Sequence, residues 1–321
     1  MLQILLVTFP FFALVLAGYV ATRWSWLPQS AIAGLNGFVL YFALPCMLYR
    51  FGSSTPIAQL LDGAVFGVYL LCALIMVAFS VCVTLSSRID WNNASFGALV
   101  AAFPNTGFMG IPLLVALLGT KAAGPAIVTI VVDLVITSSL CIALSRIGAG
   151  QGGPKLAAKN ALKGVASNPM PWAILSGAFA SWLGLQLPAP MTQTLGLLAD
   201  SASPVALFTI GAVLARSQIM ALAGHAPPVP AIDYVPLALM KLVLHPLLVL
   251  MVGSTAITLG VPLDRFALTV IVLVAALPSA SNVALLAEKF EANTGRIARI
   301  ILVSTVLAFF TFAGAVKLVA Q

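Results

Sequence analysis

The chain has 321 residues, of which 61% are hydrophobic and 7% are charged, and its formal net charge is +7. A soluble domain carries about 25% charged residues, because water must solvate its surface. This composition excludes a soluble fold of this size and leaves little room for a cytosolic catalytic domain. Lipid is the alternative solvent, and an apolar helix needs about 20 residues to cross it.

Hydropathy and helix-breaking residues predict an all-α membrane protein with about ten transmembrane helices. The first half holds spans near residues 2–21, 30–51, 63–86, 94–118 and 124–147. After a polar connection, the second half holds spans near residues 171–187, 190–215, 234–257, 265–287 and 295–318. The first apolar stretch lacks a basic leading region and a convincing cleavage site, so we expect a retained helix.

The basic residues lie mainly in short connections, which is typical of topological signals and not of nucleic-acid binding. With the N-terminus outside, ten of them lie in inner connections and four on the outer side. We therefore expect a multi-pass protein of the bacterial inner membrane with both termini in the periplasm. No Walker motif, metal-ligand spacing or catalytic cluster is visible, which predicts neither an enzyme nor a bound metal or cofactor.

Prolines recur at matching places in the two halves. Pro45 and Pro204 interrupt the second and seventh spans, and Pro104 and Pro278 interrupt the fourth and ninth. Each half has five spans, an odd number, so the second half must be inserted upside down relative to the first. Inverted repeats with interrupted helices in matching places are typical of secondary transporters, and the interruptions indicate the substrate site.

The breaks in the fourth and ninth spans therefore carry the candidate substrate site, although simple kinks at packing contacts are the alternative. Proline removes a backbone donor and glycine permits non-helical dihedral angles. Unwound backbone at membrane depth is tolerated only inside protein or beside a wet cavity. The half-helices that follow present free N–H groups, which suit a carboxylate. The candidate binding residues are Pro104, Asn105, Thr106, Gly107, Pro278, Ser279, Ser281 and Asn282.

Ionisable groups inside spans are the second set of candidates, because such groups are costly in lipid. Lys241 and His245 are four residues apart and share one helix face. Lys241 would bind an anionic substrate or pair with Asp133; alternatively, it extends toward the membrane surface. Asp133, His245 and Asp200 are candidates for proton or charge coupling, with structural hydrogen bonding as the alternative. Arg50 lies near a span end and is interpreted as an interfacial anchor.

Three segments, FPNTGFMGIPL, KLVLHPLL and ALPSASNVALLAEKF, resemble the auxin efflux carrier family, which includes plant carriers and bacterial malonate or malate permeases. The resemblance extends over the whole chain in length, span number and motif order. It implies ten helices in two inverted repeats of five, with helices four and nine crossing at the substrate. It also implies a scaffold of helices one, two, six and seven beside a moving transport domain, and a homodimer through that scaffold.

On this resemblance, residues 1–61 and 169–216 form the scaffold, residues 62–147 and 217–321 form the transport domain, and residues 148–168 form a cytoplasmic connection. The plant carriers have an Asn-Pro-Asn type of break, whereas Phe103 precedes the proline here. On the second helix, Asn36 and Tyr41 would face the transport domain and narrow the pocket. Tyr41 is equally interpreted as a packing or interfacial aromatic residue.

We therefore expect a secondary carrier of a small organic anion, such as the dicarboxylates malonate and malate, with an elevator-type mechanism. Its partners would be that anion and membrane lipid. One alternative is a sodium-coupled carrier of the bile acid transporter type. Another is a membrane receptor or channel that binds the anion without coupled transport.

Overall fold

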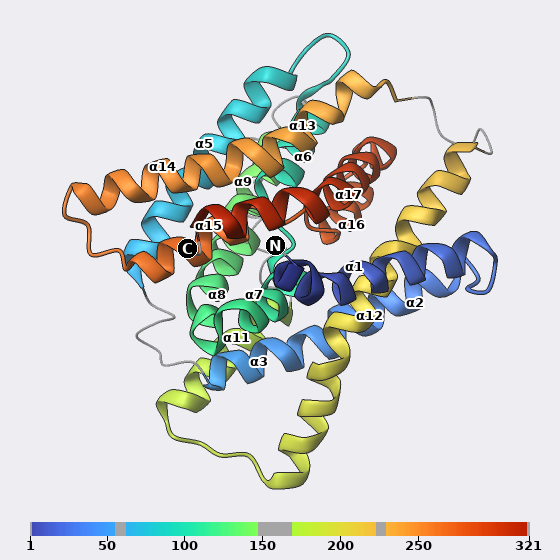
Figure 1. The fold of residues 1–321 in the computed structure, drawn as a ribbon. Helices are drawn as coiled ribbons and strands as arrows, with labels where there is room; N and C mark the ends of the chain where they lie inside the picture. The colour runs from blue at the N-terminus through green and yellow to red at the C-terminus, as the bar shows by residue number, and fades with distance from the viewer. Residues whose placement is uncertain (1, 55–61, 147–168, 223–228, 320–321) are drawn as a thin grey trace. The chain divides into compact units, whose positions relative to one another are not determined.

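The computed structural model describes residues 2–54, 62–146, 169–222 and 229–319, and the named elements of this part of the chain are all helical (Figure 1). The predicted connection at 148–168 lies outside the described residues. In chain order the α-helices are α1 (Leu2–Arg23), α2 (Ala31–Phe38), α3 (Leu44–Ser54), α5 (Gly63–Thr84), α6 (Trp91–Ala102), α7 (Ile111–Leu118), α8 (Ala123–Val131), α9 (Ser138–Ser145), α11 (Pro169–Trp182), α12 (Ala189–Leu222), α13 (Val235–Leu239), α14 (His245–Thr258), α15 (Arg265–Ala275), α16 (Asn282–Lys289) and α17 (Thr294–Val319).

Within the described residues, six helical stretches are long and apolar enough to cross a membrane: Ala31–Ser54, Gly63–Thr84, Thr120–Ser145, Ala189–Met220, Val235–Thr258 and Thr294–Val319. The all-helical, multi-pass class is therefore confirmed, but the predicted count of ten is not. The predicted fourth and ninth spans are each broken into two shorter helices, and α11, in the predicted sixth span, has only 14 residues.

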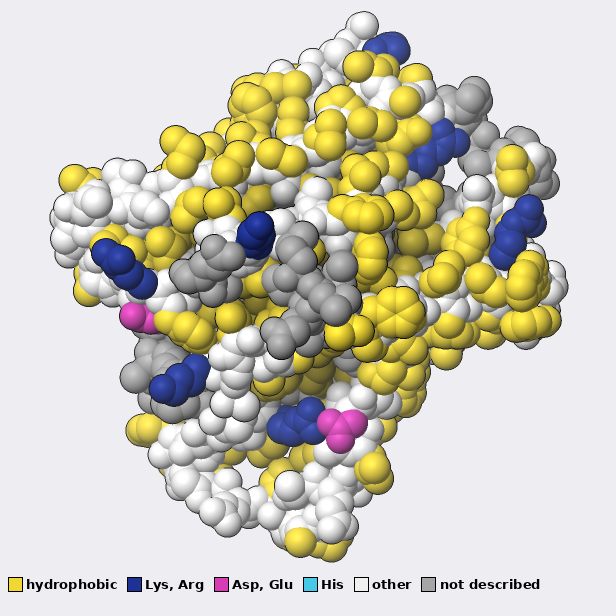
Figure 2. Space-filling model, in the orientation of Figure 1, with side chains coloured by type: hydrophobic (Ala, Val, Ile, Leu, Met, Phe, Trp, Pro, Cys, Tyr) yellow, Lys and Arg dark blue, Asp and Glu magenta, His cyan; other side chains and the backbone are white. Residues whose placement is uncertain are grey.

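Large hydrophobic side chains lie on the outside of the molecule, as lipid requires. Figure 2 shows hydrophobic side chains over much of the visible face, with the basic side chains set apart from one another. Trp24 and Trp26 are 62% and 72% exposed, and Trp182 is 66% exposed. Such amphipathic rings are enriched where lipid meets water, because their apolar body prefers lipid and their N–H group prefers water.

Three π-helical segments end two residues before a proline, where the helix widens by one residue per turn. Proline cannot donate its missing N–H, and its ring clashes with the carbonyl four residues earlier. A wider turn accommodates both defects locally, without ending the helix. The segments are η1 (Val39–Ala43) before Pro45, η2 (Thr106–Gly110) before Pro112 and η7 (Met240–Leu244) before Pro246.

Pro45 and Pro204 were predicted to interrupt the second and seventh spans, and both predictions are wrong. One helical stretch runs from Ala31 to Ser54 through Pro45. Helix α12 continues through Pro204 for 34 residues. A proline inside a helix removes one hydrogen bond, and neighbouring groups can compensate for it in a membrane protein. Interruption therefore needs further non-helical residues beside the proline, as in the fourth span.

Packing contacts divide the chain into two compact units. The first compact unit contains Met1–Asp62, Gly107–Ile127 and Asn168–Ala226, and the second contains Gly63–Thr106, Val128–Ser167 and Pro227–Gln321. Within the first unit, α1 packs on α12. Glycines make this close approach possible: a Cβ on Gly18 would lie 1.8 Å from the Phe208 carbonyl oxygen, and one on Gly211 would lie 1.8 Å from that of Val15.

A second close contact in the first unit joins α3 to α11, which lie side by side (Figure 1). Glycines again allow the two backbones to approach. A Cβ on Gly52 would lie 2.7 Å from the Ile174 carbonyl oxygen, and one on Gly177 would lie 2.3 Å from the Tyr49 carbonyl oxygen. Small residues at helix contacts let backbones approach, which is how helices in lipid gain packing energy.

In the second unit, α6 and α15 are built alike. Asp90 caps α6 by accepting a hydrogen bond from the Asn93 N–H at 2.8 Å, and Asp264 caps α15 through the Ala267 N–H at 3.2 Å. Each helix starts at an aspartate cap and reaches its proline 14 residues after that aspartate. Both helices are buried over most of their length, so they bring the two breaks into the interior of this unit.

Candidate substrate-binding site

The two breaks meet inside the second compact unit. Beyond the ends of α6 and α15 the backbone is unwound, and Pro104 pairs with Ser279 in an isolated antiparallel bridge. The Asn105 N–H donates to the Pro278 carbonyl at 2.8 Å, and a second backbone hydrogen bond of 2.9 Å closes the bridge from the other strand. Backbone groups freed by the two prolines thus bond to each other, which fixes the crossing geometry.

Several polar side chains at this crossing have no partner among the described residues. Asn105 is 4% exposed, and its side-chain amide makes no hydrogen bond there. Ser279 Oγ and Asn282 Oδ1 are buried and also unpaired. Thr106 is fully buried, with a long 3.5 Å contact from Oγ1 to the Pro104 carbonyl. Buried polar groups are nearly always hydrogen-bonded, so such a group of unpaired atoms indicates a place for a ligand.

The remaining crossover candidates flank these groups. Asn282 is the first residue of α16 and Ser281 precedes it, and both are half-buried. In this turn the Val283 and Ala284 N–H groups donate to the Ala280 and Ser281 carbonyls. Gly107 is half-buried in η2 and belongs to the first compact unit, where a Cβ on it would lie 3.8 Å from Leu44 Cδ1.

Lys241 and His245 are both fully buried in the second unit, and their side chains contact each other. Lys241 Nζ lies 3.3 Å from His245 Nδ1 and donates to the Ala275 carbonyl at 2.5 Å. Ala275 is the last residue of α15, so the ammonium group compensates the negative end of this half-helix. Lys241 thus bonds to the backbone three residues before Pro278.

Asp133 is fully buried in π-helix η4 (Val132–Thr137), and its carboxylate is held by two hydroxyl groups. Tyr69 donates to Oδ2 at 2.9 Å, and Thr137 donates to Oδ1 at 3.2 Å. Among the described residues, no ion pair within 4.0 Å joins this carboxylate to Lys241. Sequence reasoning missed Tyr69, because one phenol in an otherwise apolar span gives no periodic signal.

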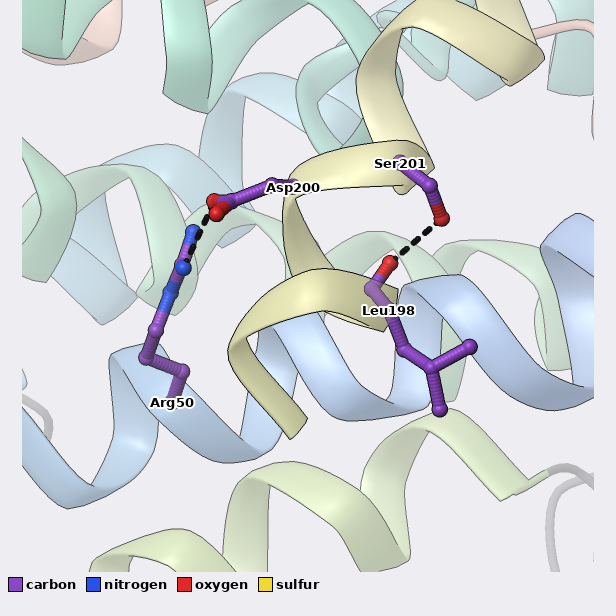
Figure 3. Close-up of polar contacts among 4 residues, drawn as sticks. All are labelled: Arg50, Leu198, Asp200 and Ser201. Atoms are coloured by element: carbon purple, nitrogen blue, oxygen red, sulfur yellow. Dashed lines mark hydrogen bonds and ion pairs between the residues drawn. The ribbon is translucent and has the colours of Figure 1, made fainter. Parts of the chain in front are cut away.

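Asp200 lies in the first unit and forms an ion pair with Arg50, as Figure 3 shows. Arg50 Nη1 on α3 reaches Asp200 Oδ1 on α12 at 2.7 Å, and the two side chains are 41% and 69% exposed. On the next residue of α12, the Ser201 hydroxyl instead donates to the Leu198 carbonyl at 2.7 Å. Arg50, interpreted from the sequence as an interfacial anchor, therefore also bridges two helices.

Asn36 and Tyr41 lie in the first unit as well. Asn36 is half-buried in α2, whereas Tyr41 is 65% exposed in η1. An open apolar hollow of about 820 Å³ runs along α11 and contains none of the predicted site residues. The described residues contain no group of three His, Cys, Asp or Glu side chains placed to hold a metal ion.

Comparison with known proteins identifies the family. A family model described as "Membrane transport protein" matches residues 4–152 and 153–316. Auxin efflux carrier component 4 of Arabidopsis thaliana is 28% identical over 134 residues, which cover 41% of this chain and 21% of that protein. The chain belongs to the auxin efflux carrier family of membrane transport proteins. This is a family of transporters and not of enzymes.

Relatives from this family match most of the chain. A Rhizobium meliloti (strain 1021) protein named "Putative malonate transporter" is 29% identical over 318 residues, covering 97% of this chain and 94% of that protein. The Escherichia coli (strain K12) protein named "Uncharacterized transporter YfdV" is 26% identical over 294 residues, covering 89% of this chain and 88% of that protein. The family resemblance that the break motifs predicted is therefore confirmed.

Proposed function

We propose that this family member is a secondary active transporter of a small dicarboxylate, such as malonate, which binds at the crossing of the two breaks. The observation that carries the proposal is the buried, unpaired Ser279 hydroxyl beside the buried Asn105 side chain at the Pro104–Ser279 bridge, because both side chains can donate to a carboxylate. The relative from Rhizobium meliloti supports malonate as the substrate to test first.

The donor groups of the crossing suit a carboxylate. The Asn105 amide and the Ser279 hydroxyl can donate hydrogen bonds, and the start of α16 adds the positive end of a helix dipole. The Lys241 ammonium group donates to the last carbonyl of α15, three residues before Pro278, and so adds a positive charge near the site. In this proposal Lys241 attracts the anion through space, and neutral donors make the direct contacts.

We also propose that the chain is an inverted repeat of two five-helix halves, and the glycine contacts support this. Gly177 follows Gly18 by 159 residues, and Gly211 follows Gly52 by the same number. In this correspondence α1 matches α11 and α3 matches α12. The α1–α12 contact therefore has the α3–α11 contact as its counterpart when the two halves are exchanged. The shared construction of α6 and α15, from aspartate cap to proline, extends the correspondence to the broken helices.

An elevator mechanism, with the second unit moving relative to a scaffold in the bacterial inner membrane, completes the proposal. The predicted scaffold segments, 1–61 and 169–216, both fall in the first compact unit, which supports this division. Residues 107–127 also group with that unit, although they were predicted to belong to the transport domain. The Ser203 hydroxyl explains part of this, because it donates to the Phe108 carbonyl at 3.0 Å.

Binding of labelled malonate to the purified protein tests the site. We expect Asn105→Ala to weaken binding by about tenfold or more, since a hydrogen bond to a charged group contributes about 1.5–3 kcal/mol. The midpoint of thermal unfolding should stay near that of the wild type, because the Asn105 side-chain amide forms no hydrogen bond with a described residue. Thr194→Ala, on an exposed turn of α12, is the control. Unchanged affinity in a folded Asn105→Ala protein would move the site elsewhere.

A further inference from the structure

We propose that the second compact unit contains a proton-coupling centre, formed by Asp133, Tyr69, His245 and Lys241, which takes up one proton with each dicarboxylate. The inference rests on the proposed function and adds the coupling ion to it. Tyr69 is the new member of this centre and acts as a positioning residue, because it holds the carboxylate and not the substrate.

The four side chains form one buried cluster from α5, η4, η7 and α14. All four are 0% exposed. Tyr69 connects the two halves of the cluster: its hydroxyl donates to Asp133 at 2.9 Å, and its ring lies 6.0 Å from the His245 ring, centroid to centroid. His245 in turn contacts Lys241 at 3.3 Å. The carboxylate of Asp133, the imidazole of His245 and the ammonium group of Lys241 are thus connected in space, in this order, inside one unit.

Both charged members lie in π-helical turns. Asp133 is in η4 and Lys241 is in η7. The turn at Lys241 is explained by the proline that follows it, but η4 has no proline within the next five residues. Single π-turns inside α-helices occur frequently at functional sites. The extra residue directs Asp133 toward Tyr69, while the Ser138 hydroxyl donates to the Asp133 carbonyl at 2.8 Å.

The neighbouring elements bring few other titratable groups to this centre. Cys72 on α5 and Cys141 on α9 are buried close to it. Helix α6 has no titratable residue, and α15 has only Arg265, at its first position. On α17, Arg296 donates instead to the Asp233 and Asn93 carbonyls at 2.8 Å each. Asp133 is therefore the carboxylate that is available to exchange a proton here.

Charge balance gives the reason for coupling. With Asp133 ionised and Lys241 protonated, the centre is neutral. A proton from water on one side of the membrane forms an O–H bond on the Asp133 carboxylate and leaves a net charge of +1, which offsets one of the two charges of malonate. On the other side the same bond breaks and the proton returns to water. Moving a dianion through a low-dielectric region is costly, so the added positive charge favours co-transport.

Lys241 links this centre to the substrate site. Its ammonium group contacts His245 on one side and the last carbonyl of α15 on the other. A change of charge at Asp133 therefore alters the positive potential beside the break that begins at Pro278. His245 Nε2 is buried without a partner, so the centre has one open position for a proton or a water molecule.

Uptake of labelled malonate into proteoliposomes tests the inference by two readouts. A pH gradient, acidic on the side of entry, should drive accumulation by the wild type. Malonate exchange against internal malonate requires no net proton movement, so it measures transport without coupling. Asp133→Asn cannot gain or lose the proton. We expect this variant to retain malonate exchange, while its accumulation of malonate in response to the pH gradient falls at least about tenfold. Asp264→Asn is the control, because asparagine also caps a helix.

Three outcomes decide between the proposals. Exchange without any response to the pH gradient in the wild type would overturn the coupling centre and leave the carrier intact. Gradient-driven accumulation by Asp133→Asn would also overturn it. Absence of malonate exchange in the wild type would overturn the proposed function, and this inference with it.

Tyr69→Phe provides a second test if Asp133→Asn does not fold. It removes one hydroxyl group and preserves the ring. The Asp133 carboxylate then loses a donor that favours its ionised form, so the pH profile of uptake should move upward by about one unit. A merely structural tyrosine would change the amount of folded protein and leave the profile in place, and an unmoved profile would contradict the assignment.

Discussion

At the scale of single residues, Asp133 and Lys241 are unusual because both are fully buried inside helices of a membrane protein. Asp133 and Lys241 are recognisable because charge is costly in lipid. Tyr69 was not recognisable as the partner of Asp133, nor Arg50 as the partner of Asp200, because a phenol or a terminal arginine in a span is ordinary. The unpaired state of the Ser279 hydroxyl also depends on tertiary contacts that no local pattern encodes.

The buried charges of Asp133 and Lys241 should depend on each other for stability. Lys241→Met removes the hydrogen bond to the Ala275 carbonyl and the positive charge that offsets Asp133 through space, so we expect a loss of about 1–3 kcal/mol in unfolding free energy. Adding Asp133→Asn to Lys241→Met should restore part of that loss. Thermal unfolding of the wild type, both single variants and the double variant measures this coupling. Strictly additive effects would show that the two charges act independently.

At the scale of elements, the breaks were predictable and the packing was not. Proline and its polar neighbours act locally, so the interruptions at Pro104 and Pro278 could be placed from the sequence alone. The same reasoning failed at Pro204, where α12 continues although Asp200, Ser201 and Ser203 make the neighbouring turn polar. Gly18 lies against the backbone of Phe208, and Gly211 lies against the backbone of Val15. These partners are far apart in the sequence, so the close helix contact is visible only in the fold.

Two glycines of α12 should respond differently to the same substitution. A Cβ on Gly211 would lie 1.8 Å from the Val15 carbonyl oxygen, whereas one on Gly196 would meet nothing within 4 Å. We expect Gly211→Ala to cost at least about 1–3 kcal/mol through overpacking. Gly196→Ala should be neutral or stabilise by up to about 1 kcal/mol, because alanine favours a helix. Thermal midpoints in detergent compare them, and equal midpoints would contradict the close α1–α12 packing.

At the scale of the whole molecule, composition alone was enough for the all-helical membrane class, because no soluble fold could cover so much apolar surface. The number of spans was less predictable. Hydropathy treats a broken helix as one span, whereas the structure divides the fourth and ninth spans into half-helices near their prolines. The positions of Lys and Arg still predict an orientation, and this can be tested directly.

We expect both termini to face the periplasm and the segment near Lys159 to face the cytoplasm. A single cysteine at position 159, on a background in which the four native cysteines are replaced by serine or alanine, should resist a membrane-impermeant thiol reagent in intact cells. The same cysteine should react after the membrane is opened. Labelling in intact cells would reverse the orientation.

We expect this family member to carry a small dicarboxylate across the membrane. Counterflow measures it most directly: proteoliposomes loaded with unlabelled malonate are placed in trace labelled malonate, with no pH or sodium gradient. A carrier exchanges the two, so we predict transient accumulation of label above its external concentration, without sodium and absent from protein-free liposomes. A channel would only equilibrate the label, a receptor would bind it without uptake, and a strict requirement for sodium would indicate the sodium-coupled class. Any of these three results would rule out a sodium-independent dicarboxylate carrier.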